Sequence, residues 1–256
     1  MTGTRLFIAG GVATVTLDEP DNKNALSVSL VESLVEHLDA AVVDPAVRAV
    51  VVTNEGNTFC AGADLKGARE GRHGAAAVGL SDVLTQIMDA PKPMIGRIHG
   101  HCMGGGVGLA AAFDISFAAR SARFGFTEAR IGVAPAVISV VCLPKLRRVD
   151  ASELFLRAGR FSADRAAEMG LITGAVSDDS LDDEIDAVLA DVVRGGPNAL
   201  AACKDLINRV PLMDRAAAFE STSALSASLF GSDEAAEGIA AFLDRRDAGW
   251  IPGAGD

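Results

Sequence analysis

The spacing of apolar and polar residues predicts strands and helices that alternate over most of the chain. Two apolar runs around Gly10-Gly11 predict a β-hairpin over 7–17. Apolar residues then recur at helical spacing up to residue 44, behind Ser27 as the expected N-cap. The continuous apolar run Val47–Thr53 is typical of a strand buried on both faces. Further strands are expected over 94–100, 114–119 and 171–176, further helices over 80–88, 107–113, 147–158 and 162–169, and a loop over 54–60.

The pattern changes near Ser177. From Leu181 onward only helical patterns occur, whereas the first part alternates strands with helices as in a layered α/β core. We therefore predict a catalytic core over residues 1–176 and a helical region over residues 177–256. The helical region is expected to pack on the core or on another subunit.

Composition narrows the classes of partner. The 256 residues carry a net charge of −11, which argues against nucleic acid and anionic membranes as partners. A phosphate-bearing ligand would need local positive charge, for which Lys23, Lys66, Lys92 and Arg97 are the nearest candidates. Four scattered cysteines without a CxxC pair suggest reduced thiols in a cytoplasmic protein, with neither a disulfide framework nor a metal site. No secretory signal or membrane-spanning stretch is expected.

The segment from His99 to Gly132 carries the strongest indication of chemistry. Three consecutive glycines, Gly104 to Gly106, precede a small-residue helix. Such a run is costly to order and suits a backbone that approaches a ligand closely, with the positive end of the helix behind it. Glu128 follows between apolar neighbours, so its pKa should be raised and it should suit proton transfer.

A second small-residue loop, Phe59 to Leu65, follows the buried strand. Taken alone it is an ordinary tight turn. Together, the two loops could supply two backbone N–H groups from separate parts of the chain, which is what a thioester enolate needs.

Two alternative interpretations of this region are less favoured. Gly106 to Ala111 fits the GxGxxA form of a dinucleotide-binding fingerprint, with Glu128 at about the right distance. However, the second strand of such a unit would end near Ala119, well before Glu128. His101 beside the glycines is more often a packed side chain than a catalytic group.

Seven segments of the chain match one family pattern: VTLDEPDNKNALS, DPAVRAVVVT, TFCAGADL, PKPMIGRIHGHCMGGGVGLAAAFDISFAA, ARFGFTEARIG, GRFSADRAAEMGL and AAFLDRR. In their order and spacing over almost the whole chain they resemble the crotonase, or enoyl-CoA hydratase/isomerase, superfamily. The resemblance implies a crotonase-like α/β stack of ββα units with a helical C-terminal region that forms homotrimers or homohexamers. It also implies an acyl-CoA thioester as ligand, with coenzyme A as part of the substrate and no separate cofactor.

The resemblance also implies roles for individual residues. The oxyanion donors would be the N–H groups of Ala63 and Gly105, with Glu128 moving a proton. Phe242 falls where a C-terminal residue commonly contacts the ligand of a neighbouring subunit. Positions implied to contact the substrate are Lys23, Ala25, Leu26, Ala61, Asp64, Leu65, Lys66, Gly104 and Gly108.

One position departs from the family. Typical hydratases have two glutamates, and the first falls on Gly108, which cannot hold or activate water. Single-glutamate members include Δ3,Δ2-enoyl-CoA isomerases. The GGGVGL and TEARIGVAPAVIS segments nevertheless look like a hydratase subgroup acting on glutaconyl-type and branched enoyl-CoA esters.

The sequence therefore favours an enoyl-CoA hydratase. A Δ3,Δ2-enoyl-CoA isomerase using Glu128 alone is the second hypothesis, and a non-catalytic acyl-CoA-binding protein is a third from another class. The acyl pocket is expected to involve residues 131–141 and 69–79.

Overall fold

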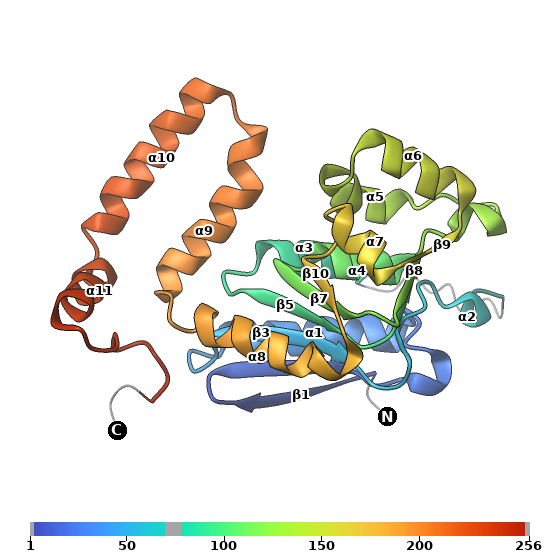
Figure 1. Cartoon of the computed structure of the whole chain (residues 1–256), viewed down its shortest axis with the longest axis horizontal. Coiled ribbons are helices and arrows are strands. Elements are labelled where there is room, and N and C mark those ends of the chain that lie inside the picture. Colours follow the sequence, from blue (N-terminus) through green and yellow to red (C-terminus); the bar gives the residue numbers. More distant parts are fainter. Residues whose placement is uncertain (1–2, 70–77, 254–256) are drawn as a thin grey trace.

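The computed structural model describes residues 3–69 and 78–253, which form two sheets, the helices around them and a helical arm (Figure 1). The larger sheet has the order β1-β2-β3-β5-β7-β10, and the smaller has the order β4-β6-β8-β9. The strands of the larger sheet are β1 (Thr4–Ala9), β2 (Val12–Leu17), β3 (Ala49–Asn54), β5 (Met94–Ile98), β7 (Ile115–Ala119) and β10 (Gly174–Val176). Those of the smaller sheet are β4 (Thr58–Cys60), β6 (His101–Met103), β8 (Arg123–Gly125) and β9 (Arg160–Ser162).

The chain passes repeatedly from one sheet to the other. β3, β5 and β7 are each followed within a few residues by a short strand of the smaller sheet, namely β4, β6 and β8. Neighbouring strands are parallel except in the pairs β1–β2 and β8–β9. This is a stack of ββα units in an α/β fold, as predicted.

Helices follow the strand pairs and cover the sheets. The helices of the core are α1 (Val28–Val43), α2 (Leu65–Arg69), α3 (Leu80–Asp89), α4 (Gly105–Ala112), α5 (Ala136–Cys142), α6 (Arg148–Arg157), α7 (Ala163–Glu168) and α8 (Leu181–Val192). Short 3-10 turns are η1 (Pro20–Asn22), η2 (Glu128–Ile131), η3 (Leu143–Lys145), η4 (Asp178–Ser180) and η5 (Val210–Leu212). The arm consists of α9 (Pro197–Arg209), α10 (Arg215–Phe230) and α11 (Asp233–Asp244).

Strand β3 shows why a continuous apolar run is needed in the centre of the larger sheet. All of its residues are buried. Val50 and Val52 face the main core, whereas Ala49 and Val51 face a second apolar cluster that includes Leu181 of α8. The strand is therefore covered on both faces, and the prediction from its apolar run is confirmed.

Several predicted elements are confirmed with small shifts in their ends. Ser27 caps α1, accepting a hydrogen bond from the Leu30 N–H at 3.2 Å. The loop expected over 54–60 was wrong in part, because Thr58–Cys60 is a strand, and β6 was not predicted at all. Both strands have three residues; β4 pairs with β6, and β6 also pairs with β8. The strand expected over 171–176 begins only at Gly174.

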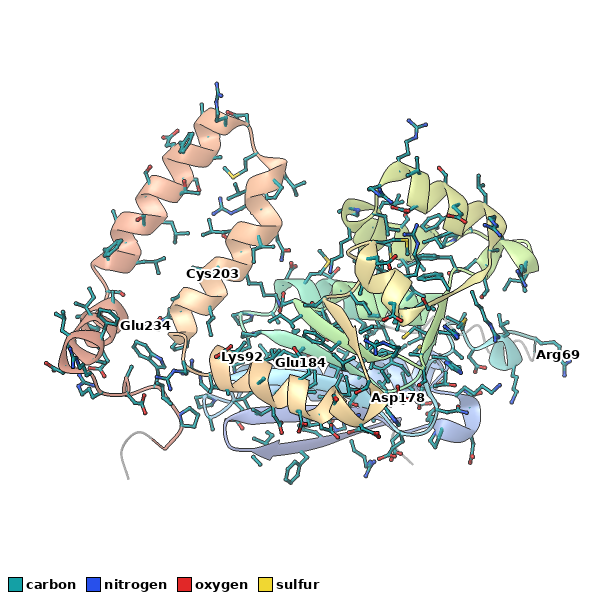
Figure 2. The ribbon with its side chains drawn as sticks, in the orientation of Figure 1. Arg69, Lys92, Asp178, Glu184, Cys203 and Glu234 are labelled. Carbon is teal, nitrogen blue, oxygen red and sulfur yellow. The ribbon has the colours of Figure 1, made fainter. Side chains whose placement is uncertain are left out.

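The helical arm leaves the core after α8 and extends away from it (Figure 1). Cys203 on α9 is exposed, on the arm rather than among the sheets (Figure 2). Lys204 attaches α9 to the core through its Nζ, which lies 2.8 Å from Asp114 Oδ2 and donates to the Ile87 carbonyl at 2.7 Å. Because α8 packs on the larger sheet, the helices that stand apart begin at α9. The division at residue 177 and the trimer or hexamer remain predictions.

Candidate active site

The smaller sheet brings the two glycine-rich loops together. β4 and β6 are parallel neighbours, so the loops that follow them, with Gly62 and Gly104, leave the same edge. Both glycines have positive φ, 85° at Gly62 and 52° at Gly104. A Cβ on Gly62 would lie 2.7 Å from the Met103 carbonyl oxygen and 3.1 Å from the Gly105 nitrogen. The loops therefore meet backbone to backbone, which a residue with a side chain would prevent.

This meeting places Ala63 and Gly105 at one cavity of about 380 Å³. The Leu26 N–H donates to the Gly62 carbonyl at 2.8 Å and fixes the first loop. Gly105 is the first residue of α4, where the N–H groups have no partner within the helix. Within residues 3–69 and 78–253, neither the Ala63 nor the Gly105 N–H donates to a protein acceptor. Both amides are available to a ligand oxygen, with the positive end of α4 beside them.

Glu128 lines the same cavity from η2. A Cβ on Gly104 would lie 3.3 Å from its Oε1, so the carboxylate rests over the glycine backbone. Its Oε2 is buried and has no hydrogen-bond partner among the described residues. Burial raises the pKa of Glu128 above its ordinary 4.5, as its apolar neighbours predicted. The site thus combines two free donors with a carboxyl group that can take or give a proton.

The chain before Glu128 is held firmly. The Gly104 N–H donates to the carbonyl of Gly125, the last residue of β8, at 2.9 Å. Phe126 is buried, and its ring lies 4.6 Å from that of Phe155, centroid to centroid. The segment that leads into Glu128 is therefore fixed to the glycine loop on one side and to the core on the other.

The remaining walls of the cavity are mostly apolar. They come from the start of α1, the start of α3 and residues 133–138, which agrees with the expected acyl pocket over 131–141. Val78 and Gly79 also line it, but most of the other expected region, 70–77, lies outside the described residues. Among the described lining residues, Glu128 is the only titratable side chain.

Comparison with known proteins shows to which family the chain belongs. The sequence model described as enoyl-CoA hydratase/isomerase matches residues 8–252. The chain belongs to the enoyl-CoA hydratase/isomerase family. It is 32% identical over 253 residues to a carnitinyl-CoA dehydratase of Salmonella enteritidis, covering 94% of this chain and 95% of that protein.

Solved structures of the family have the same fold. An enoyl-CoA hydratase of Mycobacterium smegmatis is 31% identical, with a TM-score of 0.87 over 97% of this chain and 98% of that chain. An enoyl-CoA hydratase of Bacillus anthracis is 28% identical, with a TM-score of 0.88 over 98% of this chain and 99% of that one. The crotonase-like fold implied by the sequence motifs is thereby confirmed.

The position where this family's first glutamate is implied, Gly108, does not open into the cavity. A Cβ on Gly108 would lie 2.8 Å from the Cβ of Ile138 and closer still to its Cγ2. Ile138 is only 3% exposed and itself lines the cavity. The isoleucine of α5 thus occupies the space in front of Gly108, so Gly108, predicted to contact substrate, is covered.

The predicted substrate contacts between residues 23 and 26 and between residues 61 and 66 lie together around the first loop. The Ala61 N–H donates to the Lys23 carbonyl at 3.0 Å, and Ala25 is buried beside Leu26, which lines the cavity. Asp64 accepts a hydrogen bond from the Gly67 N–H at 3.0 Å. Leu65 and Lys66 are exposed on α2, as the end of a ligand outside the cavity would require.

Two of the four basic residues considered for phosphate binding have other partners. Lys92 Nζ donates to the carbonyls of Ala41 and Asp44, and Arg97 Nε lies 2.6 Å from Asp182 Oδ1. The structure therefore leaves Lys23 and Lys66 as the candidates nearest the cavity. Lys92 and Arg97 were candidates because they lie near the loops in sequence, and that distance does not determine which partners a side chain has.

Further candidates fall outside this cavity. His101 Nδ1 accepts the Arg123 N–H at 3.1 Å and does not line the cavity. Phe242 is 83% exposed on α11 and does not line the cavity; Figure 1 shows α11 in the arm, well apart from α4 and α5. Any contact between Phe242 and the ligand of a neighbouring subunit remains a prediction.

The dinucleotide fingerprint is not realised. β6 and β7, which flank α4, belong to different sheets, so they do not form a βαβ unit. The described residues contain no group of three or more His, Cys, Asp or Glu side chains placed to hold a metal ion. Within residues 3–69 and 78–253, no helix has the length and apolar character needed to cross a membrane.

Sequence reasoning missed the role of Ile138. It lies in the apolar segment assigned to the acyl pocket, but nothing local distinguishes it from Val137 or Val140. The only signal was Gly108 itself, since a glycine inside a helix is unfavourable and suggests close packing against another element.

Proposed function

We propose that the protein is an enoyl-CoA hydratase that adds water to the double bond of a 2-enoyl-CoA. The thioester oxygen would bind between the N–H groups of Ala63 and Gly105. The observation that carries the proposal is the buried, unpartnered Oε2 of Glu128 in the cavity that these amides line. No other titratable side chain among the described lining residues competes for the proton transfer.

One carboxyl group is sufficient for the hydration step. Glu128 takes a proton from water as the water oxygen bonds to C3 of the substrate. The C2–C3 π electrons move toward C2 and the thioester oxygen, where the two N–H groups stabilise the enolate. Glu128 then delivers the proton to C2, and the ester becomes a 3-hydroxyacyl-CoA. Loss of one such donor typically lowers the rate by about 10²–10³.

The substrate class follows from the same arrangement. The coenzyme A part would lie along Lys23 to Leu26 and Ala61 to Lys66, with no separate cofactor, and the acyl part would face Val133 to Ile138. One relative is named a carnitinyl-CoA dehydratase. Removal of water is the reverse of hydration, so this name supports the reaction class. Assembly into homotrimers or homohexamers is part of the proposal.

A Δ3,Δ2-enoyl-CoA isomerase is the second candidate. Ile138 fills the space before Gly108, so the described cavity has one carboxyl group and an apolar wall where a second would project. A single carboxylate suffices to move a proton between two carbons. A non-catalytic acyl-CoA binder would need neither the free amides nor the unpartnered Oε2.

Analysis of the reaction products distinguishes the hydratase, the isomerase and the non-catalytic binder. The protein is incubated with crotonyl-CoA and with a 3-enoyl-CoA in H₂¹⁸O, and the products are identified by mass spectrometry. The proposal predicts 3-hydroxyacyl-CoA with the heavy oxygen at C3. Double-bond migration without label would indicate the isomerase. Saturable binding of both esters without any product would indicate the binder and end the proposal.

A further inference from the structure

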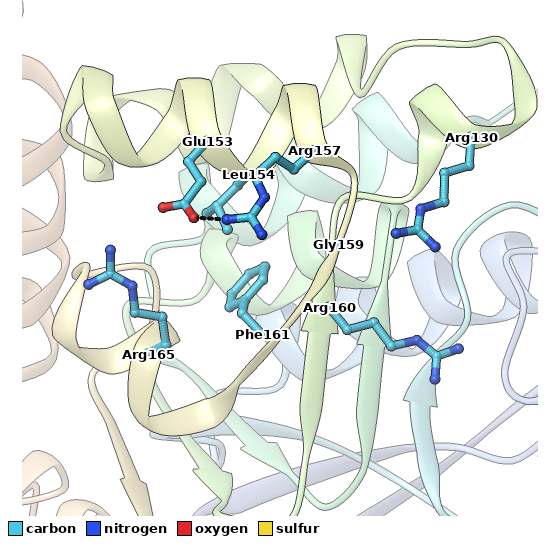
Figure 3. Close-up of a pocket in the computed structure, with 8 residues that line it drawn as sticks. All are labelled: Arg130, Glu153, Leu154, Arg157, Gly159, Arg160, Phe161 and Arg165. Atoms are coloured by element: carbon cyan, nitrogen blue, oxygen red, sulfur yellow. Dashed lines mark hydrogen bonds and ion pairs between the residues drawn. The ribbon is translucent and has the colours of Figure 1, made fainter.

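A second cavity, of about 230 Å³, lies beside η2 and shares no lining residue with the cavity of Glu128 (Figure 3). Four arginines line it, together with one carboxylate, Glu153. The arginines come from different elements: Arg130 from η2, Arg157 from α6, Arg160 from β9 and Arg165 from α7. Such a concentration of positive charge stands out in a chain with a net charge of −11.

Two of the four arginines have no counter-charge among the described residues. Arg157 pairs with Glu153, and Arg165 lies 2.7 Å from Asp150. Arg130 and Arg160 are exposed, and within the described part of the chain neither has a carboxylate within ion-pair distance. In Figure 3 these two side chains lie on the same side of Gly159. Two unpaired guanidinium groups at one cavity repel each other unless an anion lies between them.

The floor of this cavity is rigid and apolar. Leu154 is 9% exposed, and the Phe161 ring stacks on those of Phe124 and Phe126, with centroids 6.0 and 6.1 Å apart. The guanidinium groups therefore surround a fixed surface rather than a mobile loop. Planar guanidinium groups with several N–H donors match the oxygens of a phosphate, to which they can bind bidentately.

We propose that this arginine cavity binds a small phosphate-class anion, with Arg130 and Arg160 as its principal ligands. A volume of about 230 Å³ is below the range of drug-sized ligands, which starts at about 300 Å³. It suits one phosphate or diphosphate group, either free or as the end of a larger molecule that extends into solvent. Arg157 and Arg165 complete the positive wall, but their own ion pairs limit their contribution.

Calorimetry on the full chain tests the proposal with three probes: inorganic phosphate, pyrophosphate and adenosine 3′,5′-diphosphate. The test variant is Arg130→Gln/Arg160→Gln. The matched control is Arg215→Gln/Arg245→Gln, which removes the same charge from exposed positions on the arm. A second variant, Arg130→Lys/Arg160→Lys, keeps the charge and removes the bidentate geometry.

Saturable binding of at least one probe to the wild type is expected, unchanged in the control. In the glutamine variant the Kd should rise at least about tenfold, because each substitution removes a charge-assisted hydrogen bond to the anion. The lysine variant should lie between the two. Equal binding of pyrophosphate and the nucleotide would identify a free anion as sufficient, whereas binding of the nucleotide alone would identify the end of a larger ligand.

Two results would overturn the proposal. Either the wild type binds none of the probes saturably, or the glutamine variant binds them as tightly as the wild type. If, in the first case, the glutamine variant also changes the oligomeric mass in solution, the arginines would be assigned to carboxylates of a second copy of the chain.

Discussion

Replacement of Gly108 by alanine tests how tightly α4 packs against α5. Gly108 lies inside α4, where an alanine would normally stabilise the helix by about 0.5–1 kcal/mol. Here the added methyl group would lie 2.8 Å from the Cβ of Ile138 and closer to its Cγ2. Ile138 is β-branched and almost fully buried, so its side chain cannot rotate away. Either α5 shifts or the methyl group is accommodated under strain.

The size of the effect follows from these contacts. Overpacking a dense core costs about 1–3 kcal/mol, which exceeds the helix-propensity gain, so Gly108→Ala should destabilise the protein. Ile138→Ala alone should cost about 2–5 kcal/mol through the cavity it leaves. In that background the contact with Cγ2 is gone, but the Cβ of residue 138 still lies 2.8 Å from the added methyl group. Gly108→Ala should therefore destabilise the Ile138→Ala background less than it destabilises the wild type.

The assay is urea unfolding of the four proteins of this double-mutant cycle at one protein concentration, because oligomer formation shifts apparent stability. Val137→Ala supplies the control background, since Val137 is on the same helix, is 47% exposed and makes none of the three shortest contacts with a Cβ at residue 108. The effect of Gly108→Ala should be the same there as in the wild type. An alanine at 108 that leaves wild-type stability unchanged, or that acts identically with and without Ile138, would refute the reasoning.

Three further predictions concern the site and the arm. Burial raises the pKa of Glu128. The kcat/KM of the wild type should therefore fall on acidification with a midpoint above pH 4.5, because the carboxylate that accepts the proton is lost. A pH profile with a midpoint at or below that value would contradict this prediction. Gly62→Ala should lower kcat/KM by about 10²-fold, because it moves the loop that carries the Ala63 N–H. Gly10→Ala is the control: Gly10 also has positive φ, but nothing lies near its Cβ, so turnover should be unchanged. Equal rates for the two variants would be evidence against the contact between the two glycine loops. Lys204→Met should lower the free energy of unfolding by about 1–3 kcal/mol because it leaves Asp114 and the Ile87 carbonyl without their donor, and Asp114→Asn should recover part of that loss in urea titrations.

The elements predicted correctly are those whose signal is local. The apolar run of β3 and the capping serine of α1 each reflect burial or geometry within a few residues. β4 and β6 were missed because each has three residues and is stabilised by pairing with a segment about 40 residues away. No period can be recognised in so short a run.

The candidate site divides in the same way. The raised pKa of Glu128 followed from its apolar neighbours in sequence, and the meeting of the two loops followed from their small residues. The contact of Ile138 with Gly108 depends on the packing of α5 on α4, and the arginine cavity gathers residues from four elements between 130 and 165. Neither is encoded in local spacing, so both required the structure.

The turnover of Glu128→Gln on crotonyl-CoA tests the central claim most directly, since the variant keeps the size of the side chain and removes its ability to carry a proton. We expect kcat/KM to fall by at least about 10²-fold, within the usual contribution of a general acid–base group, while the Kd for an acyl-CoA is unchanged. Glu36→Gln, an exposed change on α1, should behave as the wild type. Turnover by Glu128→Gln at the wild-type rate would contradict the assignment of Glu128 as the proton carrier.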